Sequence, residues 1–506
     1  MPVLFAEIVE TSAAVASTRS RKAKIEALGR LIRALEPDEI VPAVAWLAGE
    51  PRQRRIGAGW RTLTSHDAVP AAAPELTILQ VDALLDELAV VGGAGSVARR
   101  KELLASLFGR ATAAEQQFLV RLLTNDLRQG ALVGVMTDAV AAAADVPLAV
   151  VRRAFMLSGD LPTTAAAARH GGAAELAGFA LRVLRPVQPM LASPADTLDA
   201  ALAELGSEVS VEYKLDGARI QVHRDGDEVR IYTRSLREIT DAVPELVQFA
   251  RELPCRSVVL DGESLALTDA GRPRPFQETM SSLGQGALRP YFFDCLYLDG
   301  VDLLDEPLET RLAALRKAAP DNRIPSIQRP DPAAAADYLT RALDEGHEGL
   351  MVKSLAAPYA AGRRGRSWQK VKVAHTLDLV VLGAEWGYGR RTGFLSNLHL
   401  GARDPDGGEP IMVGKTFKGL TDKLLAWQTT EFPKYQRDRD AHAVYLRPAL
   451  VVEIELDGVQ VSRRYPGGVA MRFARVVRYR PDKDPAQADT IDAVRALLPD
   501  RSRSGS

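Results

Sequence analysis

A short stretch near the middle of the chain, SVEYKLDGARIQVHRDG at residues 210–226, most constrains how this sequence can fold. Its polar–apolar alternation stops at Lys214 and resumes after Gly217, which predicts a strand, a tight loop and a second strand. Asp225-Gly226 then predicts a hairpin turn into a third strand. A lysine held at the edge of such a loop can act as a nucleophile once its ammonium has lost a proton.

The length of 506 residues is too great for one hydrophobic core, so we expect about three domains. A hydrophobic content of 46% and a charged content of 25% are typical of a soluble globular protein. The net charge of −1 means that any DNA-binding surface must be local. Cys255 and Cys295 are too few for a four-cysteine zinc site or a disulfide framework. No signal peptide or long apolar run is evident, so we expect a cytoplasmic protein with no membrane contact.

Three regions differ in periodicity, which predicts a multidomain fold. Residues 1–186 carry apolar side chains at three- and four-residue spacing, so an all-α domain is expected. The prolines in RPVQPM, at residues 185–190, predict an extended boundary. Residues 187–375 mix strand and helix patterns, which predicts an α+β domain. Residues 376–500 favour a small β-barrel of the oligonucleotide-binding (OB) type, and residues 501–506 a disordered tail.

Four further motifs follow Lys214 in a fixed order and make that lysine far more specific than it is alone. They are Asp261-Gly262-Glu263, Tyr291-Phe292-Phe293-Asp294, Glu348-Gly349-Leu350-Met351-Val352-Lys353 and Ser367-Trp368-Gln369-Lys370-Val371-Lys372. This set resembles the covalent nucleotidyltransferases and, in detail, the ATP-dependent DNA ligases. The resemblance is strong from about Met190 to Lys483 and weaker before it.

The resemblance implies an enzyme that seals nicks in duplex DNA during replication, repair or recombination. In this family a lysine attacks the α-phosphate of ATP and releases pyrophosphate. The AMP then passes to a DNA 5′-phosphate, and a 3′-hydroxyl finally displaces it. The implied substrate is ATP, the implied cofactor Mg²⁺, and the implied partner nicked double-stranded DNA bound by a monomer. Residues 1–186 would form a DNA-binding domain and residues 187–375 the adenylation domain.

The resemblance also assigns roles to single residues. Lys214 would be the nucleophile, and Glu263 and Glu348 would hold Mg²⁺, which needs only one or two protein carboxylates besides phosphate oxygens and water. Phe293 would stack on adenine and Lys353 would reach the phosphates. The full set of expected nucleotide contacts is Glu212 at the adenine end, Arg219, Arg234, Glu263, Phe293, Lys353, Arg366, Lys372, and Arg480 and Lys483 from the barrel domain.

Arg480 and Lys483 lie in the motif RYRPDK and would orient pyrophosphate when the barrel closes over ATP. The loop with Trp386, Tyr388, Arg390 and Arg391 combines aromatic and basic side chains, which suits a nucleic-acid backbone.

The helical domain offers three candidate phosphate contacts, each with an ordinary structural alternative. Arg128, in the glycine-containing junction Leu127-Arg128-Gln129-Gly130, is the strongest, although a plain glycine C-cap explains the junction equally well. Two basic clusters, one from Arg19 to Lys24 and one from Arg52 to Arg61, are more simply solvated helix faces.

Other functions remain open at this level. An RNA-capping guanylyltransferase shares the lysine motif and the barrel but needs no helical domain ahead of them. An RNA ligase is a further nucleotidyltransferase alternative. A non-enzymatic DNA-binding module would not need Lys214, Glu263 and Lys372 in this order. A ligase that uses NAD⁺ would be expected to carry a zinc module.

Overall fold

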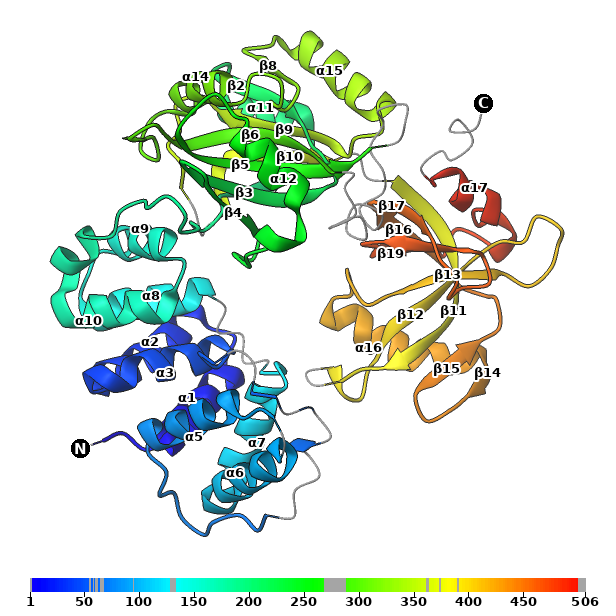
Figure 1. Ribbon diagram of the computed structural model, residues 1–506. Helices are drawn as coiled ribbons and strands as arrows, with labels where there is room; N and C mark the ends of the chain where they lie inside the picture. Colours follow the sequence, from blue (N-terminus) through cyan, green and yellow to red (C-terminus); the bar gives the residue numbers. More distant parts are fainter. Residues whose placement is uncertain are drawn as a thin grey trace.

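The computed structural model describes residues 2–498 apart from 54–55, 58, 60–61, 64–67, 94, 128–132, 268–287, 361–363, 373–374 and 389–390. Figure 1 shows three regions: N-terminal helices, a central region of sheets and helices, and a C-terminal region built on strands. In the described residues no helix is long and apolar enough to cross a membrane.

The N-terminal region is a packed set of amphipathic helices. Thr77 and Gln80 form a capping box at one helix start, and Thr112 and Glu115 form another, which explains why these helices begin there. The rings of Phe5 and Trp46, with centroids 5.5 Å apart, lie in the shared core. The helices are α1 (Phe5–Ser17), α2 (Arg21–Ala34), α3 (Pro37–Ala48), α5 (Ile78–Val90), α6 (Ser96–Arg110), α7 (Ala113–Leu123), α8 (Val133–Ala144), α9 (Leu148–Ser158) and α10 (Leu161–Ala177).

The central region contains two five-stranded sheets. One has the order β1-β10-β9-β2-β8 and the other β4-β3-β5-β6-β7. All pairings are antiparallel except that of β1 with β10. The strands are β1 (Leu191–Ala195), β2 (Val209–Tyr213), β3 (Ala218–Asp225), β4 (Glu228–Thr233), β5 (Ser257–Ala266), β6 (Leu288–Leu298), β7 (Val301–Asp302), β8 (Ser326–Gln328), β9 (Gly349–Ser354) and β10 (Arg364–Lys372).

The strand–loop–strand expected around Lys214 is present, because β2 ends at Tyr213 and β3 begins at Ala218. The expected hairpin is present too: Asp225 pairs with Glu228, and Gly226 has a φ of 61° in the turn. The helices of this region cover the sheets and are α11 (Leu198–Leu205), η1 (Thr240–Ala242), α12 (Pro244–Arg251), α14 (Leu308–Ala318) and α15 (Pro332–Asp344).

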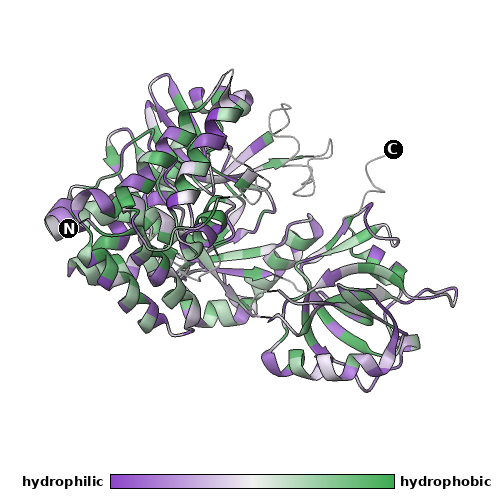
Figure 2. Cartoon of the chain, turned by 90° about the horizontal axis from the view of Figure 1, so that it is seen from below, coloured by the Kyte–Doolittle hydropathy of each residue, from purple (hydrophilic) through white to green (hydrophobic). Residues whose placement is uncertain are grey.

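The C-terminal region centres on one long strand, β11 (His375–Trp386), which pairs with β12, β15 and β16. Buried and partly buried residues alternate along β16 from Val452 onward, and the strands curve around a common apolar interior (Figure 2). The other elements are β12 (Leu395–Ala402), β13 (Ile411–Thr416), α16 (Asp422–Glu431), η3 (Phe432–Tyr435), β14 (Gln436–Arg439), β15 (Ala443–Leu446), β16 (Val451–Leu456), β17 (Gly458–Val461), β18 (Val469–Arg472), β19 (Arg475–Tyr479), η4 (Pro485–Gln487) and α17 (Ile491–Ala496).

The segment between α10 and β1 is bound along its length to the central region. The amide of Val187 donates to Gln221 Oε1 at 2.9 Å, and Gln221 Nε2 donates back to the Val187 carbonyl at 3.1 Å. The Leu184 amide donates to His223 Nδ1 at 3.1 Å. Met156 and Leu157 of α9 are part of the central hydrophobic core. Residues 185–190 lie outside helices and strands, and hydrogen bonds and shared packing fix this segment in place.

His223 is uncharged in this position. Burial lowers the pKa of His223 to about 3. Since Nδ1 accepts from the Leu184 amide, the proton lies on Nε2, which is 2.8 Å from Gln221 Oε1 and donates to it. Both ring nitrogens of the neutral His223 therefore have partners.

Ion pairs make further contacts between the regions. Arg153 of α9 pairs with Asp305 of the central region at 2.6 Å. Arg19, just before α2, pairs with Asp422 at the start of α16 at 3.3 Å, and both side chains are about three-quarters exposed. The C-terminal region meets the central region through two more pairs, which lie at the candidate site. Each region thus contacts both of the others.

Candidate active site

A pocket of about 680 Å³ lies where the two central sheets meet the C-terminal region. Its lining includes most of the residues that the sequence predicts for nucleotide binding. These are Glu212, Lys214, Arg219, Arg234, Glu263, Phe293, Glu348, Lys353 and Lys372.

The register of β2, β9 and β10 brings Lys214, Glu348 and Lys372 together. The Lys214 amide donates to the Gly349 carbonyl at 2.8 Å, and the Glu348 amide donates to the Lys214 carbonyl at 3.1 Å. Gly349 also pairs with Lys372 across the sheet. A Cβ at Gly349, which has a φ of 137°, would lie 2.2 Å from the Val371 carbonyl oxygen. Only glycine allows this approach of the three strands.

Glu348 lies between the two lysines. Its carboxylate accepts from Lys214 Nζ and lies 3.2 Å from Lys372 Nζ, which also contacts Asp457 of the C-terminal region at 2.7 Å. Burial alone would raise the pKa of Glu348, but the two ammonium groups outweigh it and hold the pKa below its usual value. Likewise, burial disfavours the charged form of Lys372, yet Glu348 and Asp457 raise its pKa.

Glu263 has a different environment on β5, in the other central sheet. Burial raises the pKa of Glu263 to about 7, although Lys214 and Arg219 oppose the shift. In the described part of the chain no group of three or more His, Cys, Asp or Glu side chains forms a metal site. Glu263 and Glu348 both line the pocket.

The inner end of the pocket is closed by a buried ion pair. Lys353 Nζ lies 2.5 Å from Glu212 Oε2, and both side chains are about 98% buried or more. The same ammonium lies 4.4 Å from the ring centroid of Phe293 and 4.2 Å from that of Trp368. The structure thus places Lys353 against Glu212 and the aromatic rings, whereas the sequence interpretation directed it to the phosphates.

Arg219 is held by a closed ring of hydrogen bonds. It donates to both oxygens of Asp261 at 3.0 and 2.7 Å and to the Met190 carbonyl at 2.8 Å. Tyr359 Oη donates to Asp261 at 2.6 Å and accepts from the Met190 amide at 2.9 Å. Within the described residues, three of the five N–H groups of Arg219 have hydrogen-bond partners. Its guanidinium lies 5.3 Å from the Phe293 ring centroid.

Asp261 and Tyr359 were not predicted as site residues. Asp261 belongs to a recognised motif, yet alone it resembles a turn residue. No signal near Tyr359 in the sequence indicates its contact.

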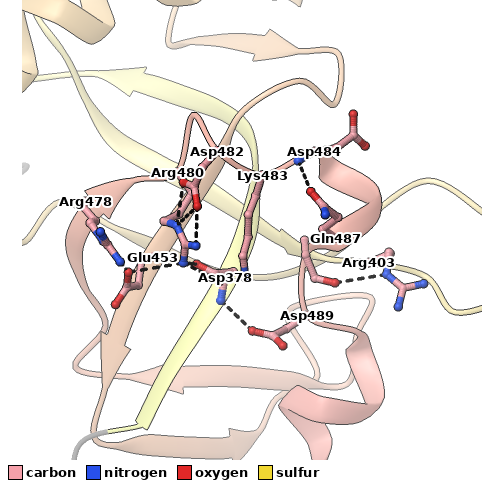
Figure 3. Close-up of polar contacts among 11 residues, drawn as sticks. Asp378, Arg403, Glu453, Arg478, Arg480, Asp482, Lys483, Asp484, Gln487 and Asp489 are labelled. Atoms are coloured by element: carbon pink, nitrogen blue, oxygen red, sulfur yellow. Dashed lines mark hydrogen bonds and ion pairs between the residues drawn. The ribbon is translucent and has the colours of Figure 1, made fainter.

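Three predicted residues lie outside the pocket lining. Arg366 is 88% exposed and pairs with Glu204 at 3.1 Å. Arg480 and Lys483 contact Asp378 within the C-terminal region (Figure 3). In this conformation none of the three is placed to contact a nucleotide bound in the pocket.

The C-terminal region instead presents Asp457, Arg472 and Phe473 to the pocket. Arg472 donates to Asp216, in the loop after Lys214, at 2.7 Å. Phe473 is 60% exposed and has a φ of 55°. The sequence interpretation missed these residues, because no motif marks Asp457 or the segment of Arg472 and Phe473 at the end of β18.

The other predicted nucleic-acid contacts have mixed outcomes. Arg21 pairs with Asp138 at 2.6 Å and Arg52 with Asp82 at 2.7 Å, so part of each basic cluster makes internal ion pairs. Tyr388 is 80% exposed. Outside the described residues lie Arg54, Arg55, Arg61, Arg128, Gln129, Gly130, Arg390 and the tail 501–506.

Comparisons with known proteins cover almost the whole chain. Family models described as DNA ligase N terminus, ATP dependent DNA ligase domain and ATP dependent DNA ligase C terminal region match residues 64–141, 189–372 and 391–483. A probable DNA ligase of Rhodococcus jostii (strain RHA1) is 68% identical over 502 residues, which cover 98% of this chain and 100% of the relative. A probable DNA ligase of Mycobacterium marinum (strain ATCC BAA-535 / M) is 53% identical, with coverage of 98% and 100%.

A solved structure described as Pmar-Lig_PreS3 is similar across 94% of this chain and 99% of its own length. Its TM-score is 0.63 and its sequence identity 16%, so the likeness concerns the fold alone.

Proposed function

Because this chain belongs to the ATP-dependent DNA ligase family, we propose that it seals nicks in duplex DNA and that Lys214 carries the AMP. The observation that carries this proposal is the position of Lys214 at the pocket, with its Nζ on Glu348 and with Lys372 on the same carboxylate. Acids and cations that could bind a triphosphate therefore surround Lys214.

The first step follows from this geometry. Lys214 loses a proton, and its Nζ attacks the α-phosphorus of ATP. The new N–P bond forms as the bond from the α-phosphorus to the bridging oxygen breaks, and pyrophosphate leaves with that oxygen. Arg219 and Lys372 neutralise phosphate charge, because both cations line the same pocket.

The inner end of the pocket supplies affinity for the base. Phe293 presents a ring on which adenine can stack. Glu212 supplies a carboxylate acceptor that its ion pair with Lys353 holds in place. A buried acceptor of this kind favours a base edge with an amino group over one with a carbonyl.

Glu263 and Glu348 would hold Mg²⁺, which would neutralise charge on the phosphates. Their role as ligands is consistent with their different environments, since Glu348 is charged between two lysines and Glu263 is poised to ionise near neutral pH.

We extend the proposal to the architecture. Residues 1–186 would be the DNA-binding domain, 187–375 the adenylation domain, and 376–500 an OB barrel. The helices of the first region and the curved sheet of the last support this division. The protein would act as a cytoplasmic monomer on nicked duplex.

The test is the transfer of label from α-labelled ATP to the denatured protein. Wild type should retain the label, and Lys214→Ala should retain none. Lys214→Arg should also fail, because a guanidinium stays protonated. Lys370→Ala is the control for loss of a pocket lysine that does not carry AMP, because Lys370 also lines the pocket. This variant should retain the label. Retention of label by Lys214→Ala would show that another residue carries AMP.

A further inference from the structure

Arg480 and Lys483 converge on one carboxylate that no motif marks. Arg480 Nη1 donates to the two oxygens of Asp378 at 3.2 and 3.0 Å, and Lys483 Nζ donates to Asp378 Oδ2 at 2.5 Å. The Asp378 side chain is 12% exposed. Figure 3 shows both cations pointing toward Asp378 from the segment that follows β19.

Asp378 is fixed to the sheet more firmly than the cations are. It lies within β11, opposite Glu453 of β16. Its amide donates to Asp489 Oδ2 at 2.7 Å, and its carbonyl accepts from the Asp489 amide at 2.8 Å (Figure 3). Arg480 and Lys483 lie beyond the end of β19, on long side chains. If another anion binds these cations, they must turn away from Asp378.

The other edge of Arg480 has a weaker partner. Its Nε and Nη2 donate to Asp482 at 3.0 and 2.7 Å, but the Asp482 side chain is 61% exposed. Exposed pairs exchange readily for another anion because water screens them. Asp378 is nearly buried, so its charge is costly to leave without these partners.

We propose that Asp378 is a positioning residue that takes the place of pyrophosphate on Arg480 and Lys483. It holds the two cations side by side at a spacing that two oxygens of one anion can bridge. It also competes with pyrophosphate for them, and so favours release of pyrophosphate after Lys214 has been adenylated. This inference rests on the proposed function, in which Arg480 and Lys483 contact the leaving group.

The reaction that reports this competition is the reversal of adenylation. An oxygen of pyrophosphate attacks the phosphorus of lysyl-AMP, the N–P bond breaks, and ATP and the free lysine form with one proton taken up by the amine. No oxidant or further reactant is needed. The concentration of pyrophosphate that discharges half of the label measures how strongly the cations bind it.

The experiment compares wild type with Asp378→Asn, each labelled with AMP as the full-length protein and then titrated with inorganic pyrophosphate. Asp378→Asn should need about tenfold less pyrophosphate, because the competing charge that contacts both cations is gone. Arg480→Ala with Lys483→Ala should need much more. Asp404→Asn removes a carboxylate from the turn after β12, where Asp404 accepts from the Asp406 amide, and should match wild type.

Each outcome decides between competition and a purely structural role. A lower pyrophosphate requirement for Asp378→Asn supports competition, because loss of packing alone cannot tighten pyrophosphate binding. An unchanged or higher requirement overturns the proposal. If Asp378→Asn does not fold, Asp378→Ser, which leaves water room to reach the cations, takes its place. If neither variant folds, Asp378 holds the region together and the proposal is wrong. A wild type that takes up no label overturns the proposed function instead.

Discussion

The central region joins its two neighbours in opposite ways. Toward the helices, the junction is buried: Met156 and Leu157 enter the central core, and the chain beyond α10 is hydrogen-bonded to Gln221 and His223. Toward the C-terminal region, the described contacts at the pocket include two charged pairs, Asp216 with Arg472 and Lys372 with Asp457.

The difference shows which junction can move. Apolar burial and satisfied backbone groups resist separation at any ionic strength, whereas partly exposed ion pairs weaken as salt increases. The C-terminal region can therefore reorient while the helices and the central sheets stay together. Reorientation is what the proposed chemistry requires, since Arg480 and Lys483 lie outside the pocket in this conformation.

The largest expected effect comes from removing the N-terminal helices, compared with removing the C-terminal region. A fragment that begins at Arg185 loses Met156, Leu157 and Leu181 from the central core, so its melting temperature should fall by about 10 °C or more relative to the intact chain. A fragment that ends at Ala374 keeps that core, so its melting temperature should lie within about 3 °C of that of the intact chain. Calorimetry on both fragments provides the test. Equal destabilisation would show that the two junctions are alike.

A second prediction uses pH to separate the junctions. The pKa of His223 is about 3 in the folded chain and 6.5 when the side chain is unperturbed. Between these two pH values the unfolded chain binds more protons at His223 than the folded chain does. The free energy of unfolding should therefore fall as pH decreases through this window. His223→Asn keeps an acceptor for the Leu184 amide but cannot titrate, and its stability should depend less on pH. Urea unfolding at several pH values measures the difference. Parallel curves would show that His223 does not control this junction.

A third prediction concerns the link from the buried junction to the pocket. Tyr359→Phe removes the donor to Asp261 and the acceptor for the Met190 amide, so Arg219 loses its fixed position. The KM for ATP in self-adenylation should rise about tenfold. Tyr338→Phe, in the same core, is the matched control and should behave like wild type. If both variants raise KM equally, general loosening of the core explains the effect.

The smallest expected effect is the opening of the charged junction by salt. Raising the ionic strength from about 0.1 M to about 1 M should lengthen the distance between dyes on the central and C-terminal regions. The distance between dyes on the helices and the central region should stay constant. Arg472→Ala should show the longer distance already at low salt, because it lacks the pair with Asp216. A salt-independent distance in wild type would contradict a movable junction.

The sequence predicted the pocket better than the contacts that support it. The motifs around Lys214, Glu263, Glu348 and Lys372 identify residues that line one pocket. Lys214, Glu348 and Lys372 lie at the ends of paired strands of one sheet, and Glu263 lies on β5 of the other. Tyr359 contacts Asp261 across 98 residues of chain, and no local pattern encodes such a contact. The exposed position of Arg366 was unpredictable for the same reason.

Lys353 illustrates a second limit of the sequence interpretation. Its motif predicts a cation near the nucleotide, and Lys353 does line the pocket. The direction of its ammonium depends on Glu212, which is brought near by strand pairing, and on two aromatic rings. A motif therefore identifies the site but not the partner of each charge.

The exposed pair of Arg19 and Asp422 has a mechanical consequence. It joins the first region of the chain to the last, so the three regions form a closed linkage rather than an open series. One joint of a closed linkage cannot turn while the others stay locked. Any rotation of the C-terminal region that carries Arg480 to the pocket must therefore strain the contact at Arg19. The side chains of Arg19 and Asp422 are largely in water, so their ion pair contributes only about 0–1 kcal/mol to the stability of this arrangement. This contact is therefore the first to break.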